Sequence, residues 1–279
     1  RSAADGLSIR AVTLTPSFSS ALILRLAGVT GLRGAAGNYR TWLMTEAVDP
    51  SPLLGGHRVD AYLSLLGYTV GDEPPPPMIH DTAPATEAWA SVVRRSGIAA
   101  ADSNDSCVVG ICPGANGPAR RWPIERFEEL VRRLSGSNAR TLVFGSDADV
   151  ALTRQVAAKA GERVIDLGGR TSLIELAGAL LSCDLLVTND TGPMHLAAAL
   201  GVPLLVLEGP ANVNQTRPLG AGVRLVGRFD LPCVPCVKNE CPRTGAGYEL
   251  AEAQGECMRL IGVDEVEVAA RSILHEERV

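Results

Sequence analysis

The chain has 279 residues, 46% of them hydrophobic, and its 26 basic and 31 acidic residues give a formal net charge of −5. This length and apolar content allow two domains of ordinary size, and the acidic balance argues against nucleic-acid binding. No apolar run reaches the roughly 20 residues that a membrane span needs, and residues 1–10 lack the pattern of a signal peptide. We expect a cytoplasmic protein whose membrane contact, if any, is peripheral and at the inner face.

The first part of the chain ends in a proline-rich connection. An apolar run over residues 9–15 precedes a loop, Ser17-Phe18-Ser19-Ser20-Ala21. Residues 71–85 include four consecutive prolines, which favour an extended and stiff segment, and a helix is predicted over 86–96. We therefore assign residues 1–100 to a first domain with its linker, and residues 101–279 to a second domain.

Apolar strands alternate with helices through the second domain. The predicted elements are strands over 107–112, 140–145, 163–167, 184–188, 203–207 and near 223–226, and helices over 124–134, 148–160, 173–182 and 193–200. A last helix has apolar positions at Val263, Val266, Ala270 and Ile273. Such alternation predicts a parallel sheet with helices on both faces. Ligands of such sheets bind beyond the carboxyl ends of the strands.

The most informative segment covers residues 185–201. Its apolar start predicts a buried strand, an Asn-Asp-Thr-Gly turn follows, and Pro193 stands where the first turn of a helix tolerates proline. A strand that leads directly into a helix N-terminus points unpaired backbone N–H groups at one spot, which suits a phosphate. The alternative is an ordinary capped helix, with Asp190 or Thr191 as N-cap and His195 on its surface.

A second motif lies in the loop after the strand over 107–112. This loop, Pro113-Gly114-Ala115-Asn116-Gly117-Pro118-Ala119-Arg120-Arg121-Trp122-Pro123, combines glycines with two arginines. Glycine lets a ligand approach the backbone closely, and the guanidinium of arginine pairs with phosphate oxygens. The alternative is an exposed basic loop whose arginines contact only water.

In this order, the two motifs resemble the nucleotide-binding half of glycosyltransferase family 9, the lipopolysaccharide heptosyltransferase family. The resemblance extends to residues 16–22, 57–63, 204–210 and 231–257. It implies an α/β fold of the GT-B type, in which two Rossmann-like domains with parallel sheets face each other across a cleft. It also implies inverting transfer of a heptose or related sugar from an ADP-sugar to a lipopolysaccharide-core, lipid-linked or similar glycan, without a cofactor.

The resemblance implies a set of functional residues. Arg120 stands at the position of a family lysine, Asp149 approximates a glutamate near the nucleoside ribose, and His195 is the one catalytic candidate within the chain. The family's general base belongs to opening βα units that we expect to lie before Arg1, so that the N-terminal domain is incomplete. The expected donor-binding residues are Ala115, Asn116, Arg120, Asp149, Thr171, Asp190, Thr191, Gly192 and His195, and the expected acceptor-side residues are Ser17, Ser19 and Ser20.

Two departures from the family pattern concern the substrates. Ser19 stands where relatives often have a basic residue, which weakens the expectation of a phosphorylated acceptor. Glu208 replaces the usual apolar or aromatic residue before Gly-Pro and would signal a different donor sugar. Two other functions stay open: a nucleotide-sugar 2-epimerase, and a protein that binds a nucleotide sugar without catalysis.

The seven cysteines fall into two groups. Three of them, Cys107, Cys112 and Cys183, accompany apolar segments and are expected to be small buried hydrophobes. The other four are Cys233, Cys236, Cys241 and Cys257. Their spacing is compatible with a structural zinc site. The last interval is long for a zinc ribbon, so we favour reduced thiols without metal.

Overall fold

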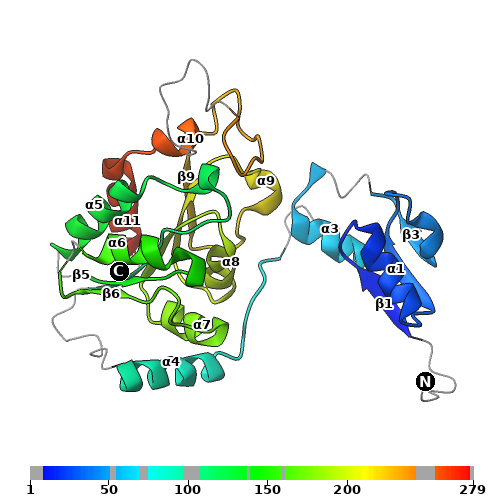
Figure 1. Cartoon of the computed structure of the whole chain (residues 1–279), viewed down its shortest axis with the longest axis horizontal. Helices are drawn as coiled ribbons and strands as arrows, with labels where there is room; N and C mark the ends of the chain where they lie inside the picture. The colour runs from blue at the N-terminus through cyan, green and yellow to red at the C-terminus, as the bar shows by residue number, and fades with distance from the viewer. Residues whose placement is uncertain are drawn as a thin grey trace. The chain divides into compact units, whose positions relative to one another are not determined.

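The computed structural model describes residues 9–50, 55–68, 75–96, 107–136, 139–158, 161–242 and 255–276. The chain divides into two compact units (Figure 1): unit 1 comprises residues 1–75 with 214–216, and unit 2 comprises residues 76–213 with 217–279. No helix among the described residues is long and apolar enough to cross a membrane.

Unit 1 contains a small parallel sheet in the order β1-β2-β3, formed by Arg10–Thr13, Gly31–Ala35 and Glu46–Val48. Its helical elements are α1 (Phe18–Leu26), the 3-10 turn η1 (Thr41–Leu43) and α3 (Arg58–Leu65). The core beneath α1 consists of the buried residues Ala21, Val29, Leu32, Leu43 and Met44.

The prediction of a loop over residues 17–21 is wrong, because α1 begins at Phe18. Ser17 is the N-cap of this helix, and its Oγ accepts a hydrogen bond of 3.3 Å from the backbone N–H of Ser20. Serine is a preferred N-cap because its hydroxyl satisfies one of the unpaired N–H groups of the first turn. The serine cluster that suggested a loop is therefore a helix-start signal.

Unit 2 is built on a six-stranded parallel sheet in the order β6-β5-β4-β7-β8-β9. In chain order the strands are β4 (Cys107–Cys112), β5 (Ala139–Val143), β6 (Val164–Asp166), β7 (Leu185–Asn189), β8 (Leu204–Glu208) and β9 (Val223–Gly227). Every predicted strand of the second domain is present, with ends that differ by at most two residues from those expected. The predicted α/β fold with parallel sheets is confirmed.

Helices cover both faces of this sheet. One core contains apolar residues of α5 (Ile124–Ser135), α6 (Val150–Ala158), α10 (Glu256–Arg259) and α11 (Val263–Glu276). The opposite core contains residues of α7 (Leu173–Leu181) and α8 (Gly192–Ala199), with Trp89 of α4 (Ala83–Ser96) packed against it. Two short 3-10 turns, η2 (Pro118–Arg120) and η3 (Asp147–Asp149), and the short helix α9 (Val213–Thr216) complete the elements.

Helix α4 packs closely on α7 and belongs to unit 2, although we expected residues 1–100 to form the first domain with its linker. Gly178 of α7 permits this approach, because a Cβ at that position would lie 2.0 Å from the carbonyl oxygen of Ala85. Arg95 of α4 also pairs with Glu175 at 2.6 Å. Glu175 forms a capping box with Ser172, and these hydrogen bonds, with that from Arg95, lower the pKa of Glu175 to about 2.

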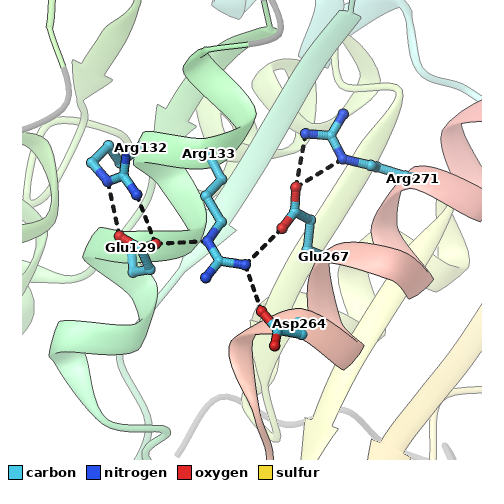
Figure 2. A network of polar contacts seen from close by, with 6 residues as sticks. All are labelled: Glu129, Arg132, Arg133, Asp264, Glu267 and Arg271. Carbon is cyan, nitrogen blue, oxygen red and sulfur yellow. Dashed lines mark hydrogen bonds and ion pairs between the residues drawn. The ribbon is translucent and has the colours of Figure 1, made fainter.

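A network of charged side chains joins α5 to α11 (Figure 2). Arg133 of α5 contacts Glu129 of its own helix and reaches Asp264 and Glu267 of α11, at 2.7 and 2.9 Å. Hydrogen bonds from Arg132 and Arg133 lower the pKa of Glu129 to about 2. The network lies at the surface, where such pairs add little to stability. The apolar faces of both helices contribute to the core on this side of the sheet.

Candidate functional site

A cavity of about 470 Å³ opens at the carboxyl edge of the unit 2 sheet. Its apolar wall consists of Cys112, Phe144, Leu173 and Leu176, and its polar wall draws on the ends of β4, β5, β6 and β7. The polar and backbone lining comprises Gly114, Ala115, Asn116, Arg121, Gly145, Ser146, Ala148, Asp149, Thr171, Ser172, Thr191 and Pro193. This is where ligands bind in parallel α/β sheets.

Asn189, the last residue of β7, holds the loop after β4 in place. This fully buried side chain donates through Nδ2 to the carbonyl oxygen of Pro113 at 2.8 Å and accepts from the backbone N–H of Trp122 at 3.0 Å. Trp122 is buried, contacts Phe127 edge-on and donates through Nε1 to the carbonyl oxygen of Ile261 at 2.9 Å. The two ends of the glycine-rich loop are thus fastened to the sheet and to the segment before α11.

Asp149 forms the floor of the cavity on the β5 side. Its Oδ2 accepts hydrogen bonds from the backbone N–H and the hydroxyl of Ser146, at 3.1 and 2.6 Å, within a capping box. A Cβ at Gly114 would lie 2.6 Å from the Asp149 carboxyl group, so only glycine permits this contact. Arg121 donates through Nε to the carbonyl oxygen of Ala115 at 3.1 Å and lies 3.9 Å from Asp149.

The N-terminus of α8 borders the same cavity. The helix starts at Gly192, one residue before the expected start, with Thr191 as N-cap, and Pro193 stands in its first turn as predicted. A Cβ at Gly192 would meet no atom within 4 Å, so there is open space in front of this turn. The predicted helix end is also confirmed, because Gly201 adopts a left-handed φ of +74° just beyond it. Unpaired N–H groups and the positive end of the helix dipole favour an anion here.

A buried charge cluster lies behind this turn. Arg120 donates through Nη1 to Asp190 at 2.9 Å, and Asp190 is only 6% exposed. Glu208, at the end of β8, is 1% exposed, and its Oε2 has no hydrogen-bond partner among the described residues. Burial raises the pKa of Asp190, against the lowering effects of Arg120 and His195. Burial, with a smaller effect from the charge of Asp190, raises the pKa of Glu208 to about 8.

The expected donor-binding residues divide among the cavity, this cluster and the first turns of α8. Ala115, Asn116, Asp149, Thr171 and Thr191 line the cavity. The others, Arg120, Asp190, Gly192 and His195, are outside its lining; His195 is exposed on the first turns of α8. Their roles toward a donor stay predictions.

Two polar lining residues, Ser146 and Ser172, were not expected at the site, and Arg121, a candidate as one of the loop's two arginines, lines the cavity although it was not among the expected donor-binding residues. The capping boxes that place the two serines were visible in the sequence as Ser-x-x-Asp and Ser-x-x-Glu. That Arg121 lines the cavity while Arg120 pairs with Asp190 depends on η2 and has no sequence signal.

The expected acceptor-side serines all lie in unit 1. Ser17 caps α1, Ser17 and Ser19 share a hydrogen bond of 2.7 Å between their hydroxyls, and Ser20 provides the capped N–H group. Buried Arg40 holds the preceding segment, because it donates to the carbonyl oxygens of Thr15 and Ala35. These contacts explain why the serines are in this order, and their role toward an acceptor stays a prediction.

Cys233, Cys236, Cys241 and Cys257 line one cavity of about 20 Å³. Among the described residues, no group of three or more His, Cys, Asp or Glu side chains is arranged to hold a metal ion. Burial raises the pKa of Cys257 to about 11, with smaller contributions from the three neighbouring thiols. The cavity also contains Ala119, so the thiol cluster lies against the turn that carries Arg120.

A parallel α/β unit with a polar cavity and an exposed helix N-terminus at the carboxyl edge of its sheet is typical of nucleotide-binding proteins. The family follows from comparison of the whole chain. The model of glycosyltransferase family 9 (heptosyltransferase) matches residues 9–246, and the chain belongs to this family.

Similar proteins agree with this assignment. Lipopolysaccharide heptosyltransferase 2 of Salmonella typhimurium is 31% identical over 231 residues, which are 78% of this chain and 64% of that protein. Its Escherichia coli counterpart is 30% identical over the same coverage. The solved E. coli ADP-heptose heptosyltransferase II superimposes with a TM-score of 0.79 at 25% identity, over 97% of this chain and 77% of that one. The matched part of the chain thus spans a little less than two thirds, 64%, of the length of the Salmonella typhimurium and E. coli relatives.

Proposed function

We propose that this chain is an inverting glycosyltransferase that moves a heptose or related sugar from an ADP-activated donor to a lipopolysaccharide-core or similar glycan. The observation that carries the proposal is the cavity beside the N-terminus of α8, which combines an apolar wall with anion-binding backbone groups. The likeness to the solved E. coli ADP-heptose heptosyltransferase II supports the donor class.

Each wall of the cavity suits one part of an ADP-sugar. Phe144 and Leu176 offer an apolar surface for a base, and Asp149, fixed by Ser146, is placed to accept hydrogen bonds from ribose hydroxyls. The N–H groups at the start of α8 would receive the diphosphate. His195 is exposed on the same helix and would contact the phosphate or the donor sugar.

The chemical step leaves a nucleoside diphosphate that gains negative charge as the sugar departs. Fixed N–H donors and the helix dipole stabilise such a leaving group without reorganisation. Arg120 adds a cation, already oriented by Asp190 at 2.9 Å. None of these contributions requires a bound metal or cofactor.

The test combines donor binding with product analysis. The chain is incubated with ADP-heptose and a truncated lipopolysaccharide core, and the products are separated by mass and by sugar stereochemistry. We expect the chain to bind the donor and to transfer heptose to the acceptor only slowly, because no general base is assigned among the described residues and such a base raises the rate by roughly 100- to 10,000-fold. Epimerised donor without transfer would favour the epimerase alternative, and binding without any product even after prolonged incubation with excess acceptor would favour the non-catalytic one.

A further inference from the structure

Glu208 occupies a position where a carboxyl group is costly. It is the last residue of β8, and the alternation along the strand puts it on the same side as Leu204 and Val206, which pack against α8. Its side chain is 1% exposed, and Oε2 is buried without a hydrogen-bond partner among the described residues. Buried polar groups are nearly always hydrogen-bonded, so each exception needs an explanation.

Near Glu208, one cation, Arg120, faces two carboxyl groups, those of Glu208 and Asp190. Asp190, at the end of β7, and Arg120, in η2, are the charged groups that act on it. Arg120 is bonded to Asp190 through Nη1, and its Nε is also buried without a partner among the described residues. On the neighbouring strand β9, the residue paired with Glu208 is Gly227, which has no side chain. His195 of α8 acts on Asp190.

A diphosphate bound at the N-terminus of α8 would be a third anionic group near the guanidinium of Arg120, in addition to the carboxyl groups of Asp190 and Glu208. With Glu208 neutral, one carboxylate and the diphosphate share the guanidinium. With Glu208 ionised, two buried carboxylates stand behind the anion site, and their repulsion opposes binding because the medium between them is poorly screened.

We propose that Glu208 is a positioning residue for the diphosphate: its neutral carboxyl leaves Arg120 to be shared between Asp190 and the ligand, and its ionisation weakens the site. The inference rests on the proposed function, because it takes the ligand to be a nucleoside diphosphate. It concerns this chain's own departure from the apolar or aromatic residue that the family usually has before Gly-Pro. Burial, which raises the pKa of Glu208 to about 8, places the transition in an accessible range.

The experiment measures ADP binding by calorimetry between pH 7 and pH 9 on the full chain, its Glu208→Gln variant and a Glu276→Gln control. Glu276 is an exposed carboxyl group near the end of α11, outside the cavity lining. We expect the affinity of the wild-type chain and of the control to fall about tenfold over this range, because ionisation of one group one pH unit below the upper limit removes about nine tenths of the binding form. Glu208→Gln, a neutral isostere, should change less than twofold.

The wild-type chain and the variants have the other titrating groups relevant to binding, including those of ADP, in common. A difference in the pH dependence of ADP affinity between wild type and Glu208→Gln therefore reports the ionisation of Glu208. Equal pH profiles for wild type and Glu208→Gln, at matching melting temperatures and circular dichroism, would overturn the inference. Binding of ADP with the expected profile but without sugar transfer would contradict the proposed function and leave this inference standing. Absence of ADP binding in the wild-type chain at every pH would overturn both.

Discussion

Two arginine–aspartate pairs lie along the same sheet edge, and their carboxylates are held by different kinds of contact. On the cavity side, Asp149 is fixed by hydrogen bonds from Ser146, and Arg121 lies 3.9 Å away. Behind α8, Asp190 is buried and has Arg120 as its ion-pair partner, with Glu208 adding a second carboxyl group. Backbone and hydroxyl donors hold the first carboxylate without help from its arginine, whereas the second pair depends on the balance of its own charges.

The difference between the two pairs indicates which side of the site responds to pH and to added charge. The capping box holds the Asp149 carboxylate in place through hydrogen bonds from a backbone N–H and a hydroxyl group. A buried carboxyl cluster with one cation responds to any further charge, whether a proton or a phosphate group. We therefore expect the cavity side to define shape and the α8 side to define the pH and charge response of the site.

We expect the largest effect on stability from the loss of Trp122, because this side chain anchors the loop that carries both arginines. Trp122 is 1% exposed and bonded to Ile261 and Asn189, between the two arginines and α5. Trp122→Ala should lower the free energy of unfolding by about 3–5 kcal/mol, because it leaves a cavity in the core and removes the hydrogen bond from Nε1 to Ile261. Chemical denaturation measures this loss; a loss below about 1 kcal/mol would show that the loop is not anchored by the indole.

The second prediction concerns the charge cluster behind α8 and the pH dependence of the free energy of unfolding. Because the pKa of Glu208 is raised from 4.5 to about 8, its neutral form is the one the folded state prefers. The wild-type chain should then lose stability as pH rises from about 4.5 to about 8, by about 1.4 kcal/mol per pH unit. Glu208→Gln has no such titration and should be more stable than wild type by on the order of 3 kcal/mol at pH 7.

Thermal unfolding at a series of pH values checks this difference. The gap in melting temperature between Glu208→Gln and the wild-type chain should be near zero at pH 4.5, widen up to pH 8 and then level off. A constant gap would mean that the substitution acts through packing and that the carboxyl group does not titrate in this window.

The extent to which the sequence predicts this structure differs between the two pairs. The Asp190-Thr191-Gly192 turn and the capping boxes were predictable, because strand periodicity, N-cap residues and proline placement are local signals. The burial of Glu208 was not, because it depends on Asp190 and Arg120, which are distant in the chain. Nor could the sequence decide which of two adjacent arginines faces Asp190: η2 is set by Gly117, whose φ is +108° and whose Cα packs against Asn239.

The third prediction sharpens the comparison by removing each arginine in turn. Arg120→Ala should weaken ADP binding by about 1–3 kcal/mol, because a charge-assisted hydrogen bond is lost. Arg121→Ala is the matched control in the same loop and should cost less than Arg120→Ala, since its side chain is half-buried and its charge lies beside Asp149. Calorimetry at low salt compares the two; an unchanged affinity for Arg120→Ala would remove this residue from the site.

The smallest expected effect concerns the thiol cluster of Cys233, Cys236, Cys241 and Cys257. This cluster adjoins the turn that carries Arg120, because the backbone N–H of Ala119 donates to the carbonyl oxygen of Asn239 at 2.9 Å. That link is a backbone bond, and a change of one thiol to a hydroxyl leaves it in place. Cys236→Ser should therefore cost about 1 kcal/mol of stability or less and leave ADP affinity unchanged.

Elemental analysis of the purified chain distinguishes reduced, metal-free thiols from a structural zinc site. With reduced, metal-free thiols, no stoichiometric metal is present and a chelator leaves the melting temperature unchanged. A structural zinc would contribute directly to folding, so a chelator would lower the melting temperature and release close to one zinc per chain. In that case Cys236→Ser would also disturb the turn beside it and weaken ADP binding, and the charge cluster behind α8 would depend on a metal site as well as on its own residues.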